Sequence, residues 1–221
     1  MEPLLTILIP TWRNPQLLQV CLHTLLLNTD YPYQVVVLNN DPAPGSKEVV
    51  EGIVKDCQVP FISARHLGSN LGWMGAINAG MQDVSTPFVC MLNDDVVFIP
   101  GQNDFWRRLV RHLALPDVGA VGPSSNFVMG VQSVFMYNGI PPQLYSKFLI
   151  GFCMVLKTEL FRQVGLLDET LPGGDDLDLS LRIRNAGFNL MCDKTAYLHH
   201  VLCQTGNRFH AGYWNSELQQ D

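Results

Sequence analysis

Short apolar runs alternate with segments of helical periodicity through the first hundred residues. Runs rich in β-favouring residues predict strands at 4–9, 35–38, 60–64 and 88–92. Apolar residues at helical spacing, or glycine-punctuated turns, predict helices from Pro15 onwards, over 46–56 and over 72–81. This order is typical of a parallel sheet covered by helices, and the absence of polar alternation in the strands indicates burial on both faces.

The pattern becomes less regular in the second half of the chain. There it predicts helices at 103–113, 159–164 and 175–186, and strands at 148–156 and 194–199. The segment 123–142 is broken by glycine and proline, and we expect a loop over a site, part of which could be strand. The residues from 204 to 221 are polar and form a weakly specified tail.

Polar residues follow three of the predicted strands. They form the clusters 11–14, 39–41 and 93–95. Ligands of open α/β sheets bind beyond the carboxyl ends of the strands, so these clusters are expected to line one crevice.

Length and charge narrow the class of protein. With 221 residues and 47% hydrophobic content, the chain suits a single α/β domain. Lys and Arg total 14 and the net charge is −6, which argues against nucleic-acid binding, because that affinity comes from clustered basic residues. A divalent cation could still supply positive charge at a phosphate-binding site.

Targeting signals are not apparent. The stretch before Pro10 lacks the basic region and cleavage site of a signal peptide, and no apolar run approaches the ~20 residues of a membrane span. We therefore expect at most peripheral membrane contact. The six cysteines are scattered and form no C-x-x-C pair, which indicates reduced thiols and a cytoplasmic protein.

Two adjacent carboxylates, Asp94 and Asp95, come directly after an apolar run and Asn93. Adjacent like charges are costly when partly buried, so the arrangement suggests a Mg²⁺ or Mn²⁺ ion that bridges a diphosphate. The alternative is an ordinary polar turn, in which Asn and Asp are common.

A second acidic cluster, Asp175, Asp176 and Asp178, opens a predicted helix after a Pro-Gly-Gly sequence. Acidic residues at a helix N-terminus are stabilised by the helix dipole, which explains them without a function. A carboxylate presented there could also act as general base toward a hydroxyl. The two interpretations are compatible.

Two further features carry weaker signals. In the pair His199 and His200, one imidazole could complete an oxygen-rich metal site or be a structural hydrogen-bonding group. The glycine-rich segment 70–80 could bring a nucleotide close to the backbone, or permit tight packing of a helix on the sheet. It does not match the G-x-G-x-x-G fingerprint of dinucleotide-binding proteins.

In order and spacing these motifs resemble family 2 glycosyltransferases, including rhamnosyltransferase-like members. The matching segments are Pro10-Thr11 with Asn14, Asn39-Asn40-Asp41, 70–80, Asn93-Asp94-Asp95, 151–157, 165–169, 174–179 and His199. The resemblance covers roughly residues 4 to 200. It implies the GT-A fold: a single α/β domain with a Rossmann-like, mostly parallel sheet flanked by helices and a smaller, mixed acceptor-side portion.

The resemblance also implies roles for individual residues. Those expected around the nucleotide sugar are Pro10, Thr11, Asn14, Asn40, Asp41, Asn70, Gly72, Asn78, Asn93 and Asp94. Asp95 is expected to bind the metal with His199 as its partner. Asp176 is the expected base, with Asp175 as its neighbour, and Phe152 and Cys153 would border the acceptor pocket.

Two positions depart from the family pattern. Asn93 occupies the first position of the D-x-D motif, which moves metal binding to Asp95. Asp175 stands where Glu is usual, and its shorter side chain leaves open which acid is the base.

The resemblance predicts an inverting, metal-assisted glycosyltransferase of polysaccharide biosynthesis. The donor would be a UDP-, dTDP- or GDP-sugar, and the acceptor a hydroxyl of a glycan, lipid-linked sugar or protein glycan. Residues 1–100 would form the nucleotide-sugar half of a single 1–221 domain, 101–203 the acceptor and catalytic half, and 204–221 the tail. The alternatives are a nucleotidyltransferase, although residues 10–14 lack its glycine-rich basic loop, and a non-catalytic nucleotide-sugar-binding module.

Overall fold

The computed structural model describes residues 2–136 and 141–201, and its centre is one eight-stranded sheet. The strands of this sheet are β1 (Leu5–Thr11), β2 (Tyr33–Asn39), β3 (Ile62–His66), β4 (Phe88–Leu92), β6 (Val118–Ser124), β7 (Gln143–Ser146), β8 (Cys153–Lys157) and β9 (Asn189–Tyr197). A second, small sheet pairs β5 (Val96–Val97) with β10 (His199–His200).

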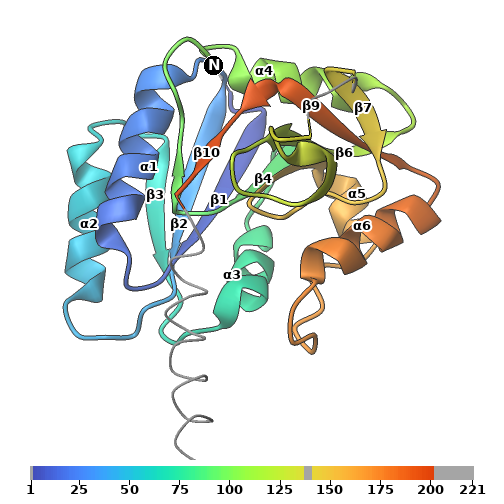
Figure 1. The fold of residues 1–221 in the computed structure, drawn as a ribbon. Helices are drawn as coiled ribbons and strands as arrows, with labels where there is room; N and C mark the ends of the chain where they lie inside the picture. The colour runs from blue at the N-terminus through green and yellow to red at the C-terminus, as the bar shows by residue number, and fades with distance from the viewer. Residues whose placement is uncertain (1, 137–140, 202–221) are drawn as a thin grey trace, which may run out of the picture.

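The large sheet has a parallel half and a mixed half, in the order β3-β2-β1-β4-β8-β6-β9-β7. Strands β3, β2, β1 and β4 are parallel, β8 is antiparallel to both of its neighbours, β6 and β9 are parallel, and β7 is antiparallel to β9. Figure 1 shows the edge strands β3 and β7 on opposite sides of the molecule. The predicted α/β class with a mostly parallel sheet is confirmed.

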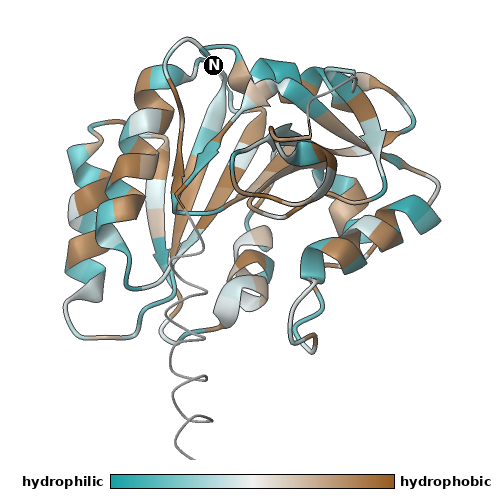
Figure 2. Ribbon diagram, viewed as in Figure 1, coloured by the Kyte–Doolittle hydropathy of each residue, from teal (hydrophilic) through white to brown (hydrophobic). Residues whose placement is uncertain are grey.

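Helices cover both faces of the sheet. They are α1 (Pro15–Asn28), α2 (Ser46–Asp56), α3 (Gly72–Met81), α4 (Phe105–Val110), α5 (Thr158–Gln163) and α6 (Asp175–Asn185), with 3-10 turns η1 (Arg111–Ala114) and η2 (Gly130–Gln132). One apolar core joins α1, α2 and α4 to one face, and a second joins α3, α5 and α6 to the other. In Figure 2 the central strands are mostly brown, as expected for strands buried on both faces.

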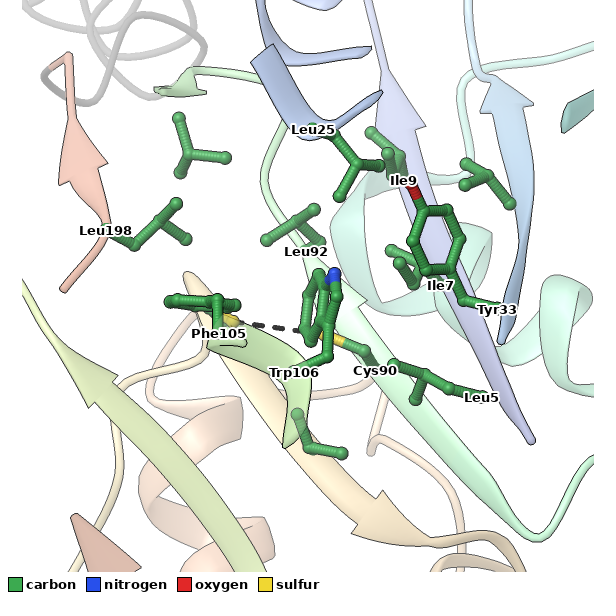
Figure 3. Packing of buried hydrophobic residues seen from close by; sticks show 14 of the residues in the cluster. Leu5, Ile7, Ile9, Leu25, Tyr33, Cys90, Leu92, Phe105, Trp106 and Leu198 are labelled. Atoms are coloured by element: carbon green, nitrogen blue, oxygen red, sulfur yellow. Dashed lines mark hydrogen bonds between the residues drawn. The ribbon is translucent and has the colours of Figure 1, made fainter. Parts of the chain in front are cut away.

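Aromatic side chains fill the core beneath α1 and α4. Trp106 and Phe105 of α4 are fully buried, and Trp106 lies against Phe98 and Tyr33 with ring centroids 5.6 and 6.5 Å apart. Figure 3 shows Trp106 beside Cys90 of β4, whose sulfur lies 3.9 Å from that of Cys153. Each aromatic side chain of this kind buries about 150–250 Å², so this cluster is a major source of stability.

The predicted strand over 148–156 begins only at Cys153. The reason lies in the backbone N–H groups before it, which bond to side chains instead of to a neighbouring strand. Leu149 donates to Ser180 Oγ at 3.1 Å, Ile150 to Gln132 Oε1 at 2.7 Å and Gly151 to Asp176 Oδ2 at 3.1 Å. The segment is thus an ordered loop with apolar composition.

Other predicted boundaries also change in the second half. The helix expected at 103–113 divides into α4 and the 3-10 turn η1, and the strand expected at 194–199 is β9, which starts earlier, followed by the separate β10. Strand β6 runs into the start of the segment predicted as a loop, β7 begins directly after it, and neither strand was predicted. The tail predicted at 204–221 lies outside the described residues.

Candidate active site

The floor of the site is where β1 and β4 end side by side. Because these strands are parallel neighbours, their carboxyl ends bring Thr11 next to Asn93, Asp94 and Asp95. The Thr11 hydroxyl donates to Asp94 Oδ2 at 2.7 Å, and the Asn14 amide lies 3.5 Å from Asp94 Oδ1. All three of these side chains are buried.

Asp94 has an unusual protonation equilibrium. Burial, together with the charge of Asp95, raises its pKa from 3.8 to about 7, although the hydrogen bonds from Thr11 and Asn14 act in the opposite direction. A buried carboxylate with a raised pKa is stabilised in its charged form when a cation binds beside it.

The β5 and β10 ladder brings a histidine to Asp95. It pairs His200 with Val96, and His200 Nε2 lies 3.1 Å from Asp95 Oδ1. The other ring nitrogen, Nδ1, lies 3.1 Å from the Phe127 carbonyl oxygen. Burial would lower the pKa of His200, but the hydrogen bond to Asp95 and its charge outweigh that effect, so the pKa is raised.

The loop after β6 holds this histidine in place. The Asn126 amide donates to the His200 carbonyl at 3.0 Å, and its oxygen accepts from the His200 N–H at 2.8 Å. The Phe152 ring stacks on the imidazole at a centroid distance of 5.4 Å, so the ring has contacts on its edge and on its face.

His199 does not meet Asp95. Its Nδ1 lies 3.2 Å from the Tyr197 hydroxyl, and its backbone pairs with Val97. Successive residues of a strand point to opposite sides, so only one of the two histidines can face Asp95. The structure places His200 and not His199 beside Asp95, and the expectation that paired His199 with Asp95 is corrected accordingly.

The side-chain amides of Asn40 and Asn70 form a hydrogen-bond network on the side of the site next to α3. Asn40 Nδ2 donates to Asn70 Oδ1 and to the Gly72 carbonyl, both at 2.9 Å, while Asn40 Oδ1 accepts from the Leu71 N–H at 2.7 Å. Gly72 has a φ of +69°, a conformation that favours glycine. This network determines how the first turn of α3 enters the site.

Asp41 and Asn78, both expected around the nucleotide, do not line the cavity. Asp41 accepts the Ala43 N–H at 3.0 Å and lies 3.7 Å from Arg13 Nε. Asn78 donates to the Leu167 carbonyl and to Glu169 Oε1, each at 2.8 Å. The structure thus places both side chains in contacts within the protein.

The second acid pair stands at the N-terminus of α6. Asp176 Oδ2 accepts the Gly151 N–H at 3.1 Å. Burial and the charge of Asp176 raise the pKa of Asp175, against a hydrogen bond from the Trp73 side chain. Asp176 is therefore held by the loop before β8.

Most of the predicted site residues line one cavity of roughly 470 Å³, whereas Asn14, Asp41, Asn78, Cys153 and His199 do not. It is lined by Pro10, Thr11, Trp12, Asn40, Asn70, Gly72, Trp73, Asn93, Asp94, Asp95, Ile150, Gly151, Phe152, Asp175, Asp176 and His200. Phe152 is in this lining, whereas the Cys153 side chain is fully buried against Cys90.

Sequence reasoning missed Trp12, Ile150 and Gly151. Trp12 could have been found from the sequence, because it lies between Thr11 and Asn14, which were expected around the nucleotide sugar. In the structure, Arg13 stacks over the Trp12 ring at 4.9 Å. Arg13 has a φ of +54°, which is uncommon outside glycine and fits a site where the backbone is constrained. Gly151 opens the matching segment 151–157, but its role comes from its backbone N–H, which the sequence does not assign.

Within the described residues, no cluster of three or more His, Cys, Asp or Glu side chains is arranged to hold a metal ion. Asp95 and His200 offer one carboxylate and one imidazole, which suit Mn²⁺ or Mg²⁺ only if a ligand supplies further oxygens. The carboxylate of Asp95 and the imidazole of His200 fit a cation that binds together with a diphosphate. Among the helices of residues 2–136 and 141–201, none has the length and apolar character needed to cross a membrane.

Sequence comparison agrees with the fold. The family model "Glycosyl transferase family 2" matches residues 6–164, and the chain belongs to this family. It is 26% identical over 226 residues to the O-antigen biosynthesis protein RfbC of Myxococcus xanthus, an alignment that covers 90% of this chain and 17% of the relative. The chain also spans only 60% of the uncharacterised mycobacterial relatives, including Rv1525 of Mycobacterium tuberculosis.

Solved structures show the same fold. The mannosyltransferase PcManGT from Pyrobaculum calidifontis, in complex with GDP-Man and Mn²⁺, has a TM-score of 0.74 at 20% identity, covering 93% of this chain and 59% of that one. GalNAc-T7 with UDP, GalNAc and Mn²⁺ has a TM-score of 0.74 at 13% identity, covering 90% and 44%. The fold is therefore GT-A, as the resemblance implied.

Proposed function

We propose that this domain transfers a sugar from a nucleoside-diphosphate donor to an acceptor hydroxyl. The observation that carries the proposal is that two acid pairs of different character line one cavity: Asp94 and Asp95 at the sheet edge, and Asp175 and Asp176 on α6. The first pair suits a cation and a diphosphate, and the second suits activation of a hydroxyl.

The donor side would be built from β1, β4 and α3. Trp12 offers an aromatic wall for a base, and the Thr11 and Asp94 pair lies where polar groups of the nucleotide would enter. Asp95 and His200 would hold Mn²⁺ or Mg²⁺, with the diphosphate completing the coordination. The cation would neutralise the departing diphosphate.

The imidazole of His200 is prepared for that role by its surroundings. Its Nδ1 faces the Phe127 carbonyl, so the proton on Nδ1 is retained and Nε2 is the nitrogen directed at Asp95. Histidine ligands of metals commonly donate their other N–H in this way. Two solved structures with the same fold contain Mn²⁺ together with GDP-Man or with UDP and GalNAc, which supports the proposal.

We propose a single in-line displacement with inversion. The acceptor oxygen would attack the anomeric carbon, the bond from that carbon to the diphosphate oxygen would break, and the acceptor proton would pass to Asp176. The Gly151 N–H at 3.1 Å from Asp176 Oδ2 directs this carboxylate toward the cavity. Asp175 would be its neighbour and not the base.

The acceptor would be a hydroxyl of a glycan, free or carried on a lipid or protein. The similarity to an O-antigen biosynthesis protein supports a role in polysaccharide assembly. Phe152 would border the acceptor side of the cavity, because its ring faces the site while Cys153 points into the core.

The direct test is a thermal-shift screen of UDP-, dTDP- and GDP-sugars with and without Mn²⁺, followed by transfer assays with the stabilising donor. We expect one donor class to raise the melting temperature only with Mn²⁺, because a ligand that binds the native state stabilises it. Asp95→Ala should remove this shift, and Asp56→Ala, on the exposed end of α2, should keep it. Donor hydrolysis without transfer would favour a binding module, and no response to any donor would refute the proposal.

A further inference from the structure

Gln132 is a buried glutamine whose side-chain amide has a partner at each end. It is the last residue of the 3-10 turn η2 and is 1% exposed. Its Nε2 donates to the Pro123 carbonyl at 3.0 Å, and its Oε1 accepts the Ile150 N–H at 2.7 Å. Since Pro123 belongs to β6 and Ile150 lines the cavity, this amide joins a strand of the sheet to a wall of the site.

The position of Gln132 is itself fixed by the end of β6. The Ser125 N–H donates to the Gln132 carbonyl at 2.9 Å, and the Val134 N–H donates to the Ser125 carbonyl at 3.0 Å. Gly122 of β6 lies so close to the Gln132 side chain that a Cβ there would be 2.6 Å from Nε2. Because glycine has no Cβ, residue 122 leaves the space that the amide occupies.

The loop that Gln132 holds is attached to α6 on both sides of Ile150. On one side, the Leu149 N–H donates to Ser180 Oγ at 3.1 Å. On the other side, the Gly151 N–H donates to Asp176 Oδ2 at 3.1 Å. Residues 176 and 180 are four apart on α6, and therefore lie on the same face of the helix. The loop is thus held by α6 through its two outer N–H groups and by η2 through the middle one.

The backbone connects Gln132 to the expected base in one step. Only the φ and ψ angles of Ile150 separate the peptide group that bonds to Gln132 from the peptide group that bonds to Asp176. Each peptide group is planar, so fixing the first group restricts where the N–H of the second can point.

From these contacts we infer that Gln132 is a positioning residue for the proposed transfer, acting by holding Ile150 so that the Gly151 N–H meets the Asp176 carboxylate. The inference rests on the proposed function, because that function assigns Asp176 as the base. It adds a residue that is outside the cavity lining and that sets the geometry of the base from the far side of the loop.

The test is Gln132→Met, which nearly conserves the length of the side chain and removes both hydrogen bonds. With the donor found in the screen, we expect the transfer kcat to fall about tenfold, because a small displacement of a catalytic group slows the chemical step. The Kd of the matching nucleoside diphosphate with Mn²⁺ should change less than twofold, because the proposed donor side is built from β1, β4 and α3. A wild-type kcat, or a loss confined to diphosphate binding, would overturn the inference.

A double-mutant cycle with Asp176→Asn shows whether Gln132 acts through the base. In the Asp176→Asn background, Gln132→Met should lower kcat less than twofold further, because the group that it positions is already disabled. Losses that add in full would contradict this route of action.

A measurement without a donor keeps this inference separate from the proposed function. Hydrogen exchange of the Gly151 amide should be at least about tenfold faster in Gln132→Met than in the wild-type protein, while the amides of β1 stay protected. The Gly151 amide bonds to Asp176 and not to Gln132, so its exchange reports how the loop is held. Unchanged exchange at Gly151, or equal acceleration in β1, would refute the positioning role whether or not a donor is found.

Gln102→Met is the matched control for a general loss of stability. Gln102 is also buried, and its amide bonds to the Tyr197 carbonyl at 2.6 Å and to the Tyr197 N–H at 2.8 Å. This variant loses the same kinds of hydrogen bond at the end of β9 and should leave exchange at Gly151 unchanged. Acceleration at Gly151 equal to that in Gln132→Met would count against the inference.

Gln132→Asn is a second variant that retains a polar side chain in case Gln132→Met does not fold. Its amide is one methylene too short to reach both Pro123 and Ile150, so it should show the same pattern of slower transfer and faster exchange at Gly151. Wild-type values for both measurements in Gln132→Asn would overturn the inference.

Discussion

Two buried carboxylates, Asp193 on β9 and Asp94 at the sheet edge, have opposite properties. Asp193 is fully buried, and burial alone would raise its pKa, but hydrogen bonds from Thr195 and His112 lower it below the ordinary value. His112 Nε2 and Arg111 Nη2 lie 2.7 and 3.1 Å from its Oδ2. Asp94 is also buried, but Thr11 and Asn14, which donate to it, are neutral, and its pKa rises to about 7.

The different groups that surround Asp193 and Asp94 indicate a different role for each carboxylate. Asp193 is satisfied by groups of its own chain, and its network fastens β9 to η1, so it is structural. Asp94 lies in a cavity beside a second carboxylate and accepts only from neutral donors, so an added cation would stabilise its charged form. Burial therefore does not by itself distinguish a structural acid from a functional one, whereas the nature of the donors around it does.

The largest effect is expected on the transfer rate when Asp176, on the side of the cavity opposite Asp94, is replaced. Asp176→Asn should reduce the transfer kcat by about 10² to 10⁴, the usual contribution of a general base, with melting temperature and donor Kd unchanged. The matched control is Asp178→Asn, which removes an ion pair with Arg182 on the same turn and leaves the cavity intact. If Asp176→Asn transferred at the wild-type rate, the base would have to be another group.

The second largest effect is expected on the stability of the fold when the structural acid, Asp193, is replaced. Asp193→Asn should reduce the free energy of unfolding by about 3 kcal/mol at neutral pH, because it removes the charge with which Arg111 pairs and weakens the hydrogen bond between His112 and a buried oxygen. Denaturant unfolding measures this. Asp83→Asn, in an exposed ion pair with Arg65, should cost less than about 1 kcal/mol.

The contribution of Asp193 to the free energy of unfolding should decrease as the pH falls. The folded pKa of Asp193 is lowered, so its contribution to stability is present above the unfolded value of 3.8 and is lost as the pH falls through the folded pKa. The gap between wild type and Asp193→Asn should therefore narrow on acidification below about pH 4. A gap that stays constant there would show that the charge of Asp193 is not what stabilises the fold.

A smaller effect separates the two histidines. His200→Ala should weaken Mn²⁺ binding in the presence of a nucleoside diphosphate by at least about tenfold, as followed by the EPR signal of free Mn²⁺. His199→Ala is the matched control and should bind Mn²⁺ as the wild type does. Equal losses in the two variants would point to a structural role for the β10 strand.

The smallest expected effect concerns the neutral donors of Asp94. Thr11→Val conserves shape and removes the hydroxyl that lies 2.7 Å from Asp94, so diphosphate affinity should fall by about tenfold or less. Thr6→Val, on the same strand but bonded to Thr86, should leave affinity unchanged. A loss in Thr6→Val of the same size would trace the effect to β1 as a whole.

The parallel half was predictable because its signals are local. The ranges expected for α2, α3 and β4 match those in the structure, since each is a local segment of helical period or a continuous apolar run with a clear boundary. In the mixed half, β7 is short and exposed on alternate residues, and the loop before β8 has the composition of a strand. Its conformation depends on Ser180, Gln132 and Asp176, which are distant in sequence.

The sequence by itself determined that polar and acidic residues follow the buried strands, and hence where a site would form. Only the tertiary structure decided which of these residues meet. It selected His200 over His199, because the pairing of β10 with β5 presents alternate residues to Asp95. It also showed that Asp41 and Asn78 bond within the protein. Composition and spacing are local properties, whereas the direction of a side chain depends on the strand or helix that packs against it.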